Sequence, residues 1–143
     1  MEQFSLAMNG IVKSFPGVKA LSGIDFNVRP NEVHALLGIN GAGKSTLIKI
    51  LAGIYQKDAG EIYINDRLVA INSPGDARKN GIATVYQDPQ MIPTFAGYEN
   101  IFLGSETKSN SVFSRISRKD MRRRAQELLD RYAFDVDLTK TVD

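Results

Sequence analysis

A glycine-rich loop at residues 38–46 constrains the fold of this chain more than any other part of the sequence. Its letters, GINGAGKST, fit the pattern G-x-x-x-x-G-K-[ST]. The apolar run at residues 33–37 precedes it and is typical of a strand buried on both faces. After it, residues 44–52 carry leucine and isoleucine at helical spacings, and Gly53 stands where a helix C-cap glycine belongs. Strand, loop and helix in this order predict a phosphate-binding loop, whereas a chance glycine turn before a lysine would not explain the context.

Each residue type in the loop has a chemical reason to be there. The glycines permit backbone angles closed to other residues, so that amide groups can turn toward phosphate oxygens at a helix N-terminus. Lys44 is predicted to reach the β and γ phosphates, Ser45 to ligate magnesium through its hydroxyl, and Thr46 to donate to the α phosphate. The expected ligands are therefore ATP and Mg²⁺. The candidate nucleotide-binding residues of the loop are Gly38, Ile39, Asn40, Gly41, Ala42, Gly43, Lys44, Ser45 and Thr46.

Turn residues and apolar runs predict the remaining elements of the N-terminal part. The predicted strands are residues 4–12, 24–28, 61–64, 67–70 and 82–86. The turn signals at residues 15–17 and 65–66 favour hairpins. Ser73 and Pro74 predict a short helix that ends near Gly81.

The C-terminal part is predicted to be helical. One or two helical turns are expected at residues 99–103, followed by a polar linker at residues 105–114. Ser117 and Asp120 resemble a capping box. The apolar face of the helix that follows comprises Met121, Ala125, Leu128, Leu129 and Tyr132. The basic cluster is Arg115, Arg118, Lys119, Arg122, Arg123 and Arg124, which we interpret as a solvated helix face instead of a nucleic-acid site.

Composition removes several classes of site. The sequence holds no cysteine, which excludes disulfides, thiolate zinc sites and cysteine nucleophiles. No apolar run approaches the ~20 residues of a membrane helix, so any link to a membrane is expected to run through a partner. His34, the only histidine, lies within a predicted strand and is interpreted as a buried, hydrogen-bonded structural residue.

Several stretches of the chain resemble the ATP-binding cassette of ABC transporters, and most closely the sugar-importer branch of ribose and galactose type that carries two cassettes in one polypeptide. The matching stretches are residues 14–21, 38–46, 73–74, 76–77, 81–87, 99–104 and 121–129. The resemblance implies an α/β fold with a P-loop NTPase core and parallel sheet, an N-terminal antiparallel β portion and the start of a helical subdomain. It places the cassette portion at residues 1–104 and the helical subdomain from residue 105 to 143.

The resemblance also implies roles for individual residues. Phe15 stands where the family has an aromatic residue that stacks on adenine, although a core phenylalanine is the alternative. Gln87 stands where the family has a catalytic glutamine that touches Mg²⁺ and the attacking water, although it can also simply end a strand. Lys44 is the second residue expected to act in catalysis, and Ser45 and Gln87 are the expected metal ligands. Residues 88–100 correspond to the region that faces the membrane-spanning subunit, and Asp88-Pro89 departs from the family pattern there.

The implied partners are transmembrane permease subunits, a second ATP-binding cassette and, indirectly, a solute-binding protein, with no nucleic acid. The implied location is peripheral, at the cytoplasmic face of the membrane. The sequence contains no Leu-Ser-Gly-Gly-Gln signature, no later strand ending in Asp-Glu and no later histidine, so we expect an N-terminal fragment that binds ATP without hydrolysing it. The alternative function is a small phosphotransferase or GTPase in which Asp88 would be the metal-binding acid.

Overall fold

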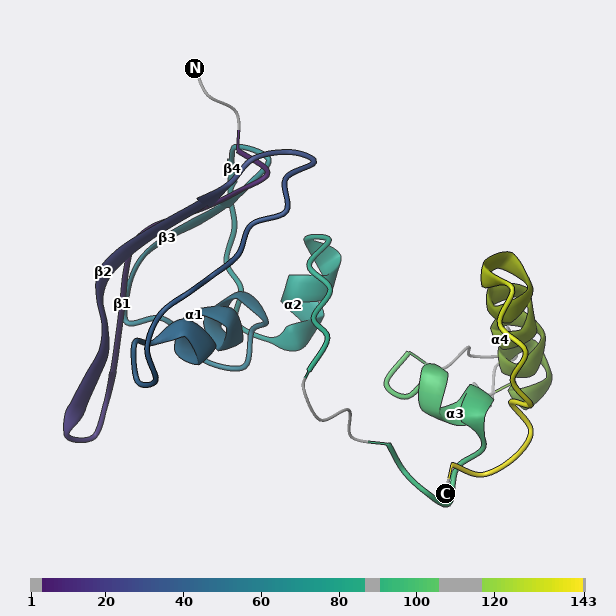
Figure 1. The fold of residues 1–143 in the computed structure, drawn as a ribbon. Helices are drawn as coiled ribbons and strands as arrows, with labels where there is room; N and C mark the ends of the chain where they lie inside the picture. The colour runs from purple at the N-terminus through teal and green to yellow at the C-terminus, as the bar shows by residue number, and fades with distance from the viewer. Residues whose placement is uncertain (1–3, 87–90, 106–116, 143) are drawn as a thin grey trace, which may run out of the picture. The chain divides into compact units, whose positions relative to one another are not determined.

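Two β-hairpins build the sheet of the N-terminal part of the chain (Figure 1). A computed structural model describes residues 4–86, 91–105 and 117–142. Strands β1 (Leu6–Phe15) and β2 (Val18–Val28) form the first hairpin, and β3 (Ala59–Ile64) and β4 (Arg67–Leu68) form the second. The sheet has the order β2-β1-β3-β4, and every pairing in it is antiparallel.

Both predicted hairpin turns are confirmed, and their residues explain the tight reversals. Phe15 pairs directly with Val18, so only Pro16 and Gly17 form the first turn, and Gly17 has a φ of 79°. In the second turn Asn65 and Asp66 adopt φ angles of 48° and 61°. Asparagine, aspartate and glycine tolerate this left-handed region better than other residues, and such turns match the twist of the flanking strands.

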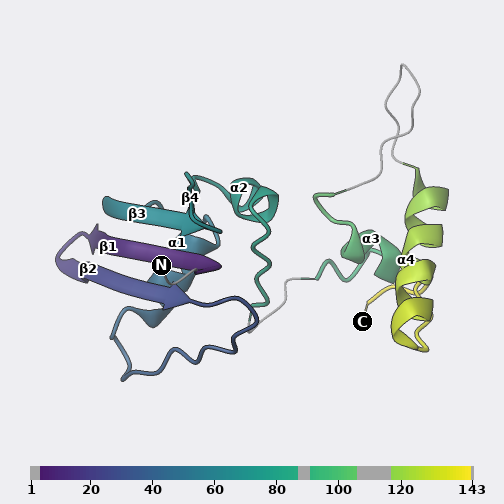
Figure 2. The same ribbon diagram turned by 90° about the horizontal axis from the view of Figure 1, so that it is seen from above.

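A short helix covers one face of the sheet (Figure 2). Helix α1 (Lys44–Leu51) is confirmed as predicted, and it inserts Leu47 and Ile50 into the core. The remaining core side chains come from the strands, from Ile71 and from Ala77 of helix α2 (Pro74–Lys79). Those fully enclosed are Met8, Ile11, Ile50 and Ile62. Burial of each such side chain contributes about 1.5–3 kcal/mol, so the core fixes α1 against the sheet.

Two predicted strands are not strands in the structure. Residues 33–37 and 82–86 belong to no sheet, and the exposed fractions of Val33 and Val85 are 101% and 96%. Only Leu36 and Ile82 of these segments pack against the core. A buried strand needs neighbours that accept its backbone hydrogen bonds, and the antiparallel sheet does not extend to either segment. The expected parallel sheet is therefore not formed among the described residues.

His34 is hydrogen-bonded as predicted but is not buried. Its Nδ1 lies 2.7 Å from Oε1 of Glu32, and its ring meets the Phe26 ring nearly at right angles, with centroids 5.1 Å apart. The side chain nevertheless remains 36% exposed. The prediction of burial fails because it depended on a strand at residues 33–37.

A second compact unit starts at Tyr86. Helices α3 (Gly97–Ile101) and α4 (Arg118–Tyr132) pack around Phe102, with Leu138 closing the cluster. The side chain of Asn100 organises the preceding loop, because its Oδ1 accepts from the Ile92 amide at 2.8 Å and its Nδ2 donates to the Ile92 carbonyl at 3.1 Å. The structure thus confirms both predicted helices of this part.

The faces of α4 agree with the sequence prediction in part. Met121, Ala125 and Leu129 are buried, but Leu128 and Tyr132 are 38% and 64% exposed, because the cluster around Phe102 reaches only one side of the helix. The described members of the basic cluster are exposed on α4 as predicted. Among all described residues, no helix is both long and apolar enough to cross a membrane.

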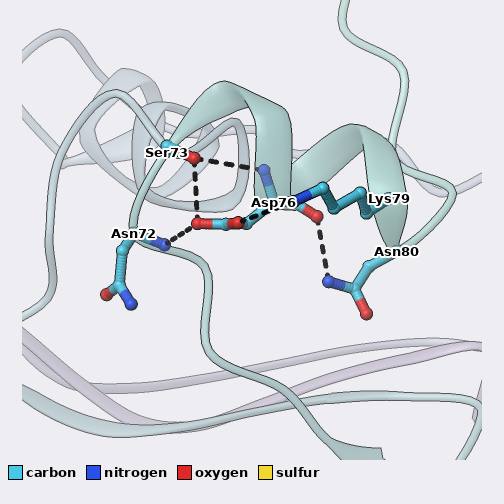
Figure 3. Close-up of polar contacts among 5 residues, drawn as sticks. All are labelled: Asn72, Ser73, Asp76, Lys79 and Asn80. Carbon is cyan, nitrogen blue, oxygen red and sulfur yellow. Dashed lines mark hydrogen bonds and ion pairs between the residues drawn. The ribbon is translucent and has the colours of Figure 1, made fainter.

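Helix α2 begins with a network of polar contacts (Figure 3). The hydroxyl oxygen of Ser73 accepts from the Asp76 amide at 3.2 Å and donates to Oδ2 of Asp76 at 2.9 Å. The same carboxylate accepts from the Asn72 amide at 3.2 Å. These hydrogen bonds, with that from Ser73 first, lower the pKa of Asp76. The predicted helix start at Ser73 and Pro74 is therefore confirmed. The negative charge of Asp76 in the first turn complements the helix dipole.

We predict that Ser73→Ala destabilises the N-terminal unit by about 1 kcal/mol, because the Asp76 amide loses its cap. Urea unfolding followed by circular dichroism measures this change. Asn72→Ala is the matched control, since Asn72 contributes only its backbone amide to the network. Equal stability of Ser73→Ala and Asn72→Ala would contradict the capping role.

Candidate phosphate-binding site

The predicted loop wraps the N-terminal end of α1. Gly41 and Gly43 adopt φ angles of 84° and 85°, and the helix begins at the next residue, Lys44. No side chain in the described part of the chain caps this helix end. The described residues also provide no acceptor for the amides of Lys44, Ser45 and Thr46, as is normal in a first helical turn. The loop therefore presents several open backbone donors where the helix dipole is positive.

The Lys44 side chain turns back over the loop from this helix start. Its Nζ donates to the carbonyl oxygens of Gly38 at 2.5 Å and of Ile39 at 2.8 Å. The loop itself is tightened by a hydrogen bond from the Ala42 amide to the Ile39 carbonyl at 3.3 Å. The loop thus holds a full positive charge in addition to its open amides, and both groups attract an anion.

Gly43 is required by a close approach between the loop and β2. A methyl group at this position would lie 2.6 Å from Cδ2 of Leu21 and 2.7 Å from the Ala20 carbonyl oxygen. The positive φ of Gly43 adds a second reason for glycine. The first helical residue is therefore set directly beside β2.

The loop is accessible to a ligand. Every residue from Gly38 to Ala42 is exposed, as is Ser45, while Gly43, Lys44 and Thr46 are half-buried. Among the described residues, no group of three or more acidic, histidine or cysteine side chains is arranged to hold a metal ion. The Ser45 hydroxyl is thus the candidate metal ligand of the loop. Gln87 and Asp88 lie outside the described residues.

Phe15 ends β1 in an aromatic and charged environment. Its ring is half-buried and meets the Tyr55 ring at 70°, with centroids 5.2 Å apart. The Lys13 ammonium lies 5.5 Å from the Phe15 centroid and 2.8 Å from Oδ1 of Asp58. The hydrogen bond from Lys13, followed by that from the Ser14 amide, lowers the pKa of Asp58.

Sequence reasoning missed Tyr55 and Asp58. Both lie between α1 and β3, where the chain offers no motif that marks them. The one available signal was that Tyr55 is aromatic and follows α1 closely, which could have indicated a contact with another ring. The structure brings the Tyr55 ring to Phe15 and the Asp58 carboxylate to Lys13 and Ser14, the two residues before Phe15.

Solved structures with the same fold are ATP-binding cassettes. The structure of cbiO1 from Clostridium perfringens, part of the ABC transporter complex cbiONQ, is 28% identical with a TM-score of 0.66, covering 97% of this chain and 54% of that one. The ATP-binding cassette MJ1267 of an ABC transporter is 26% identical with a TM-score of 0.76, covering 96% of this chain and 57% of that one. The fold class is therefore the α/β fold of P-loop NTPase domains.

The family profile described as ABC transporter matches residues 21–142, and this chain belongs to that family. A ribose import ATP-binding protein, RbsA 1 of Rubrobacter xylanophilus, is 51% identical over 92% of this chain and 26% of its own length. The galactofuranose transporter ATP-binding protein YtfR of Escherichia coli is 42% identical over 96% of this chain and 27% of its own. The chain thus spans about a quarter of the length of these curated relatives. Membership of this family disfavours the small phosphotransferase or GTPase with Asp88 as its metal-binding acid.

We predict that Gly43→Ala destabilises the N-terminal unit by more than about 1 kcal/mol, because the new methyl group adds a clash to a strained φ. Gly41→Ala isolates the strain, since its φ is 84° but no atom lies within 4 Å of the new methyl group. Gly38→Ala, which adds only an ordinary contact 3.4 Å from Cβ of Ala42, is the matched control. Urea unfolding should rank Gly43→Ala as most destabilised, and an equal effect of all three would contradict the close approach.

Proposed function

We propose that the loop at residues 38–46 binds the phosphates of Mg-ATP, as part of the cassette that powers sugar import through an ABC transporter. The observation that carries the proposal is that one loop holds both the Lys44 ammonium and the open amides of the first turn of α1. A triphosphate presents several negative oxygens, which suit such a set of donors.

In the proposed complex, different residues of the loop contact different phosphates. The open amides at the start of α1 surround the β phosphate, and Thr46 donates to the α phosphate. Lys44 exchanges the carbonyls of Gly38 and Ile39 for oxygens of the β and γ phosphates. The exchange is favourable because hydrogen bonds between two charged groups are stronger than those to a neutral carbonyl. Lys44 also stabilises negative charge on the γ phosphate during its transfer to water.

Ser45 and Gln87 are assigned as the protein ligands of the magnesium ion. The Ser45 hydroxyl is exposed at the start of α1 and is a hard oxygen ligand of the kind that Mg²⁺ prefers. Gln87 keeps its predicted role of contacting the ion and the attacking water. Bound Mg²⁺ would neutralise phosphate charge, while the protein groups hold the phosphate chain in place.

Phe15 is assigned the role of stacking on the adenine base. An aromatic face offers broad contact with a flat base, and Phe15 is only half-buried in its cluster. Adenine recognition by stacking favours ATP but contains no hydrogen-bond readout of the base. Discrimination against GTP is therefore expected to be modest.

Sugar import is proposed from the relatives, whose names specify ribose import and galactofuranose transport. The proposed partners are permease subunits, a second cassette and, through the permease, a solute-binding protein. Residues 88–100 are the proposed contact with the permease, and residues 105–143 the start of the helical subdomain. The cassette would lie at the cytoplasmic face of the membrane as a peripheral subunit.

We predict that Lys44→Ala weakens binding of Mg-ATP at least about tenfold, because a charge-assisted contact to phosphate is lost. Calorimetric titration of the 143-residue chain measures the affinity. Arg67→Ala is the matched control, because it removes an exposed cation from β4 of the same unit. A parallel titration with GTP tests the base preference. Unchanged affinity in Lys44→Ala would reject the loop as the phosphate site.

The 143-residue chain on its own is expected to bind ATP without turnover. Its sequence contains no second motif that supplies a carboxylate to position water or a signature to complete the site. Steady-state phosphate release should therefore equal that of Lys44→Ala. Sustained turnover that disappears in Lys44→Ala would show that these residues suffice for hydrolysis.

A further inference from the structure

Tyr55 is tied to the C-terminal end of the helix that begins at the phosphate-binding loop. The chain leaves α1 through Gly53, which has a φ of 74°, and then turns back so that the amides of Ile54 and Tyr55 both donate to the Lys49 carbonyl at 2.9 and 3.2 Å. The Lys49 ammonium also lies 5.3 Å from the centroid of the Tyr55 ring. The position of this ring therefore follows the position of α1.

The same ring is the aromatic neighbour of Phe15. The near-perpendicular arrangement, with centroids 5.2 Å apart, is a favoured geometry for aromatic pairs because the positive edge of one ring meets the negative face of the other. Both rings are half-buried, and Tyr55 also packs against the core of the N-terminal unit. Their mutual contact is thus a main restraint on the orientation of Phe15.

The ion pair between Lys13 and Asp58 also restrains Phe15, because Lys13 belongs to the same strand, β1. Asp58 accepts from the Lys13 ammonium at 2.8 Å and from the Ser14 amide at 2.6 Å. The backbone amide of Asp58 in turn donates to the Val12 carbonyl at 2.9 Å. These contacts fix the end of β1 and keep the Lys13 ammonium near the Phe15 ring.

We propose that Tyr55 is a positioning residue for the nucleotide base: it orients Phe15 for stacking and links that ring through α1 to the phosphate-binding loop. The inference rests on the proposed binding of ATP by this chain. A ring already held in its stacking orientation loses less conformational freedom when a base docks on it. Tyr55 acts through Phe15, so its effect is confined to ligands that carry a base.

The test compares Mg-ATP with magnesium tripolyphosphate, which offers the phosphate chain without a base. Calorimetric titration of the 143-residue chain gives both affinities. Tyr55→Leu should weaken ATP binding about two- to tenfold, which is the change in affinity expected when one aromatic pair is lost. It should leave tripolyphosphate binding unchanged. Tyr55→Phe, which retains the ring, should restore ATP binding. Tyr63→Leu is the matched control, because Tyr63 lies in β3 and contacts Glu61.

A second variant covers the case in which Tyr55→Leu fails to fold. Asp58→Asn keeps the side-chain volume but weakens the restraint on Lys13 and Ser14, and should also weaken ATP binding selectively. Unchanged ATP affinity in Tyr55→Leu, or an equal loss for ATP and tripolyphosphate, would overturn the positioning role while leaving the proposed function intact. Failure of the folded, unmodified chain to bind ATP would instead overturn the proposed function and this inference with it.

Discussion

The close approach of Gly43 to β2 is the contact on which the rest of the N-terminal unit depends. A methyl group there would meet the Ala20 carbonyl and the Leu21 side chain, so only glycine lets the helix start at this distance from the sheet. Leu47 and Ile50 then reach the core, and Lys44 points back over the loop. One steric constraint therefore sets both the packing of α1 and the placement of the charged group of the site.

The features that the sequence predicted well are those set by neighbouring residues. The hairpin at Asn65 and Asp66 and the cap at Ser73 each depend on hydrogen bonds and backbone angles within a few residues. The candidate phosphate-binding loop belongs to the same class, because its conformation comes from Gly41 and Gly43 and from the helix that follows. Local chemistry was enough to predict the loop glycines and the helix that carry the candidate site.

The features that the sequence predicted poorly depend on distant parts of the chain. The apolar residues Val33 and Val85 suggest buried strands, but burial requires neighbouring strands, and here both side chains are almost fully exposed. The contact between Phe15 and Tyr55 joins residues separated by strand β2, the glycine-rich loop and helix α1. No periodicity in the sequence could reveal that contact, because it arises from the way α1 packs beneath the sheet.

Helix α1 connects two kinds of recognition in the proposed complex with ATP. At its start, Lys44 already has two neutral carbonyl partners, so a phosphate adds only the difference between charged and neutral acceptors, together with the bonds to the open amides. At its end, Tyr55 contacts the ring assigned to adenine. A shift of α1 that improved the phosphate contacts would also move Tyr55, and the reverse holds as well. Affinity for the whole nucleotide should therefore depend on how rigidly α1 is held, which returns the argument to the Gly43 contact and the core beneath the sheet.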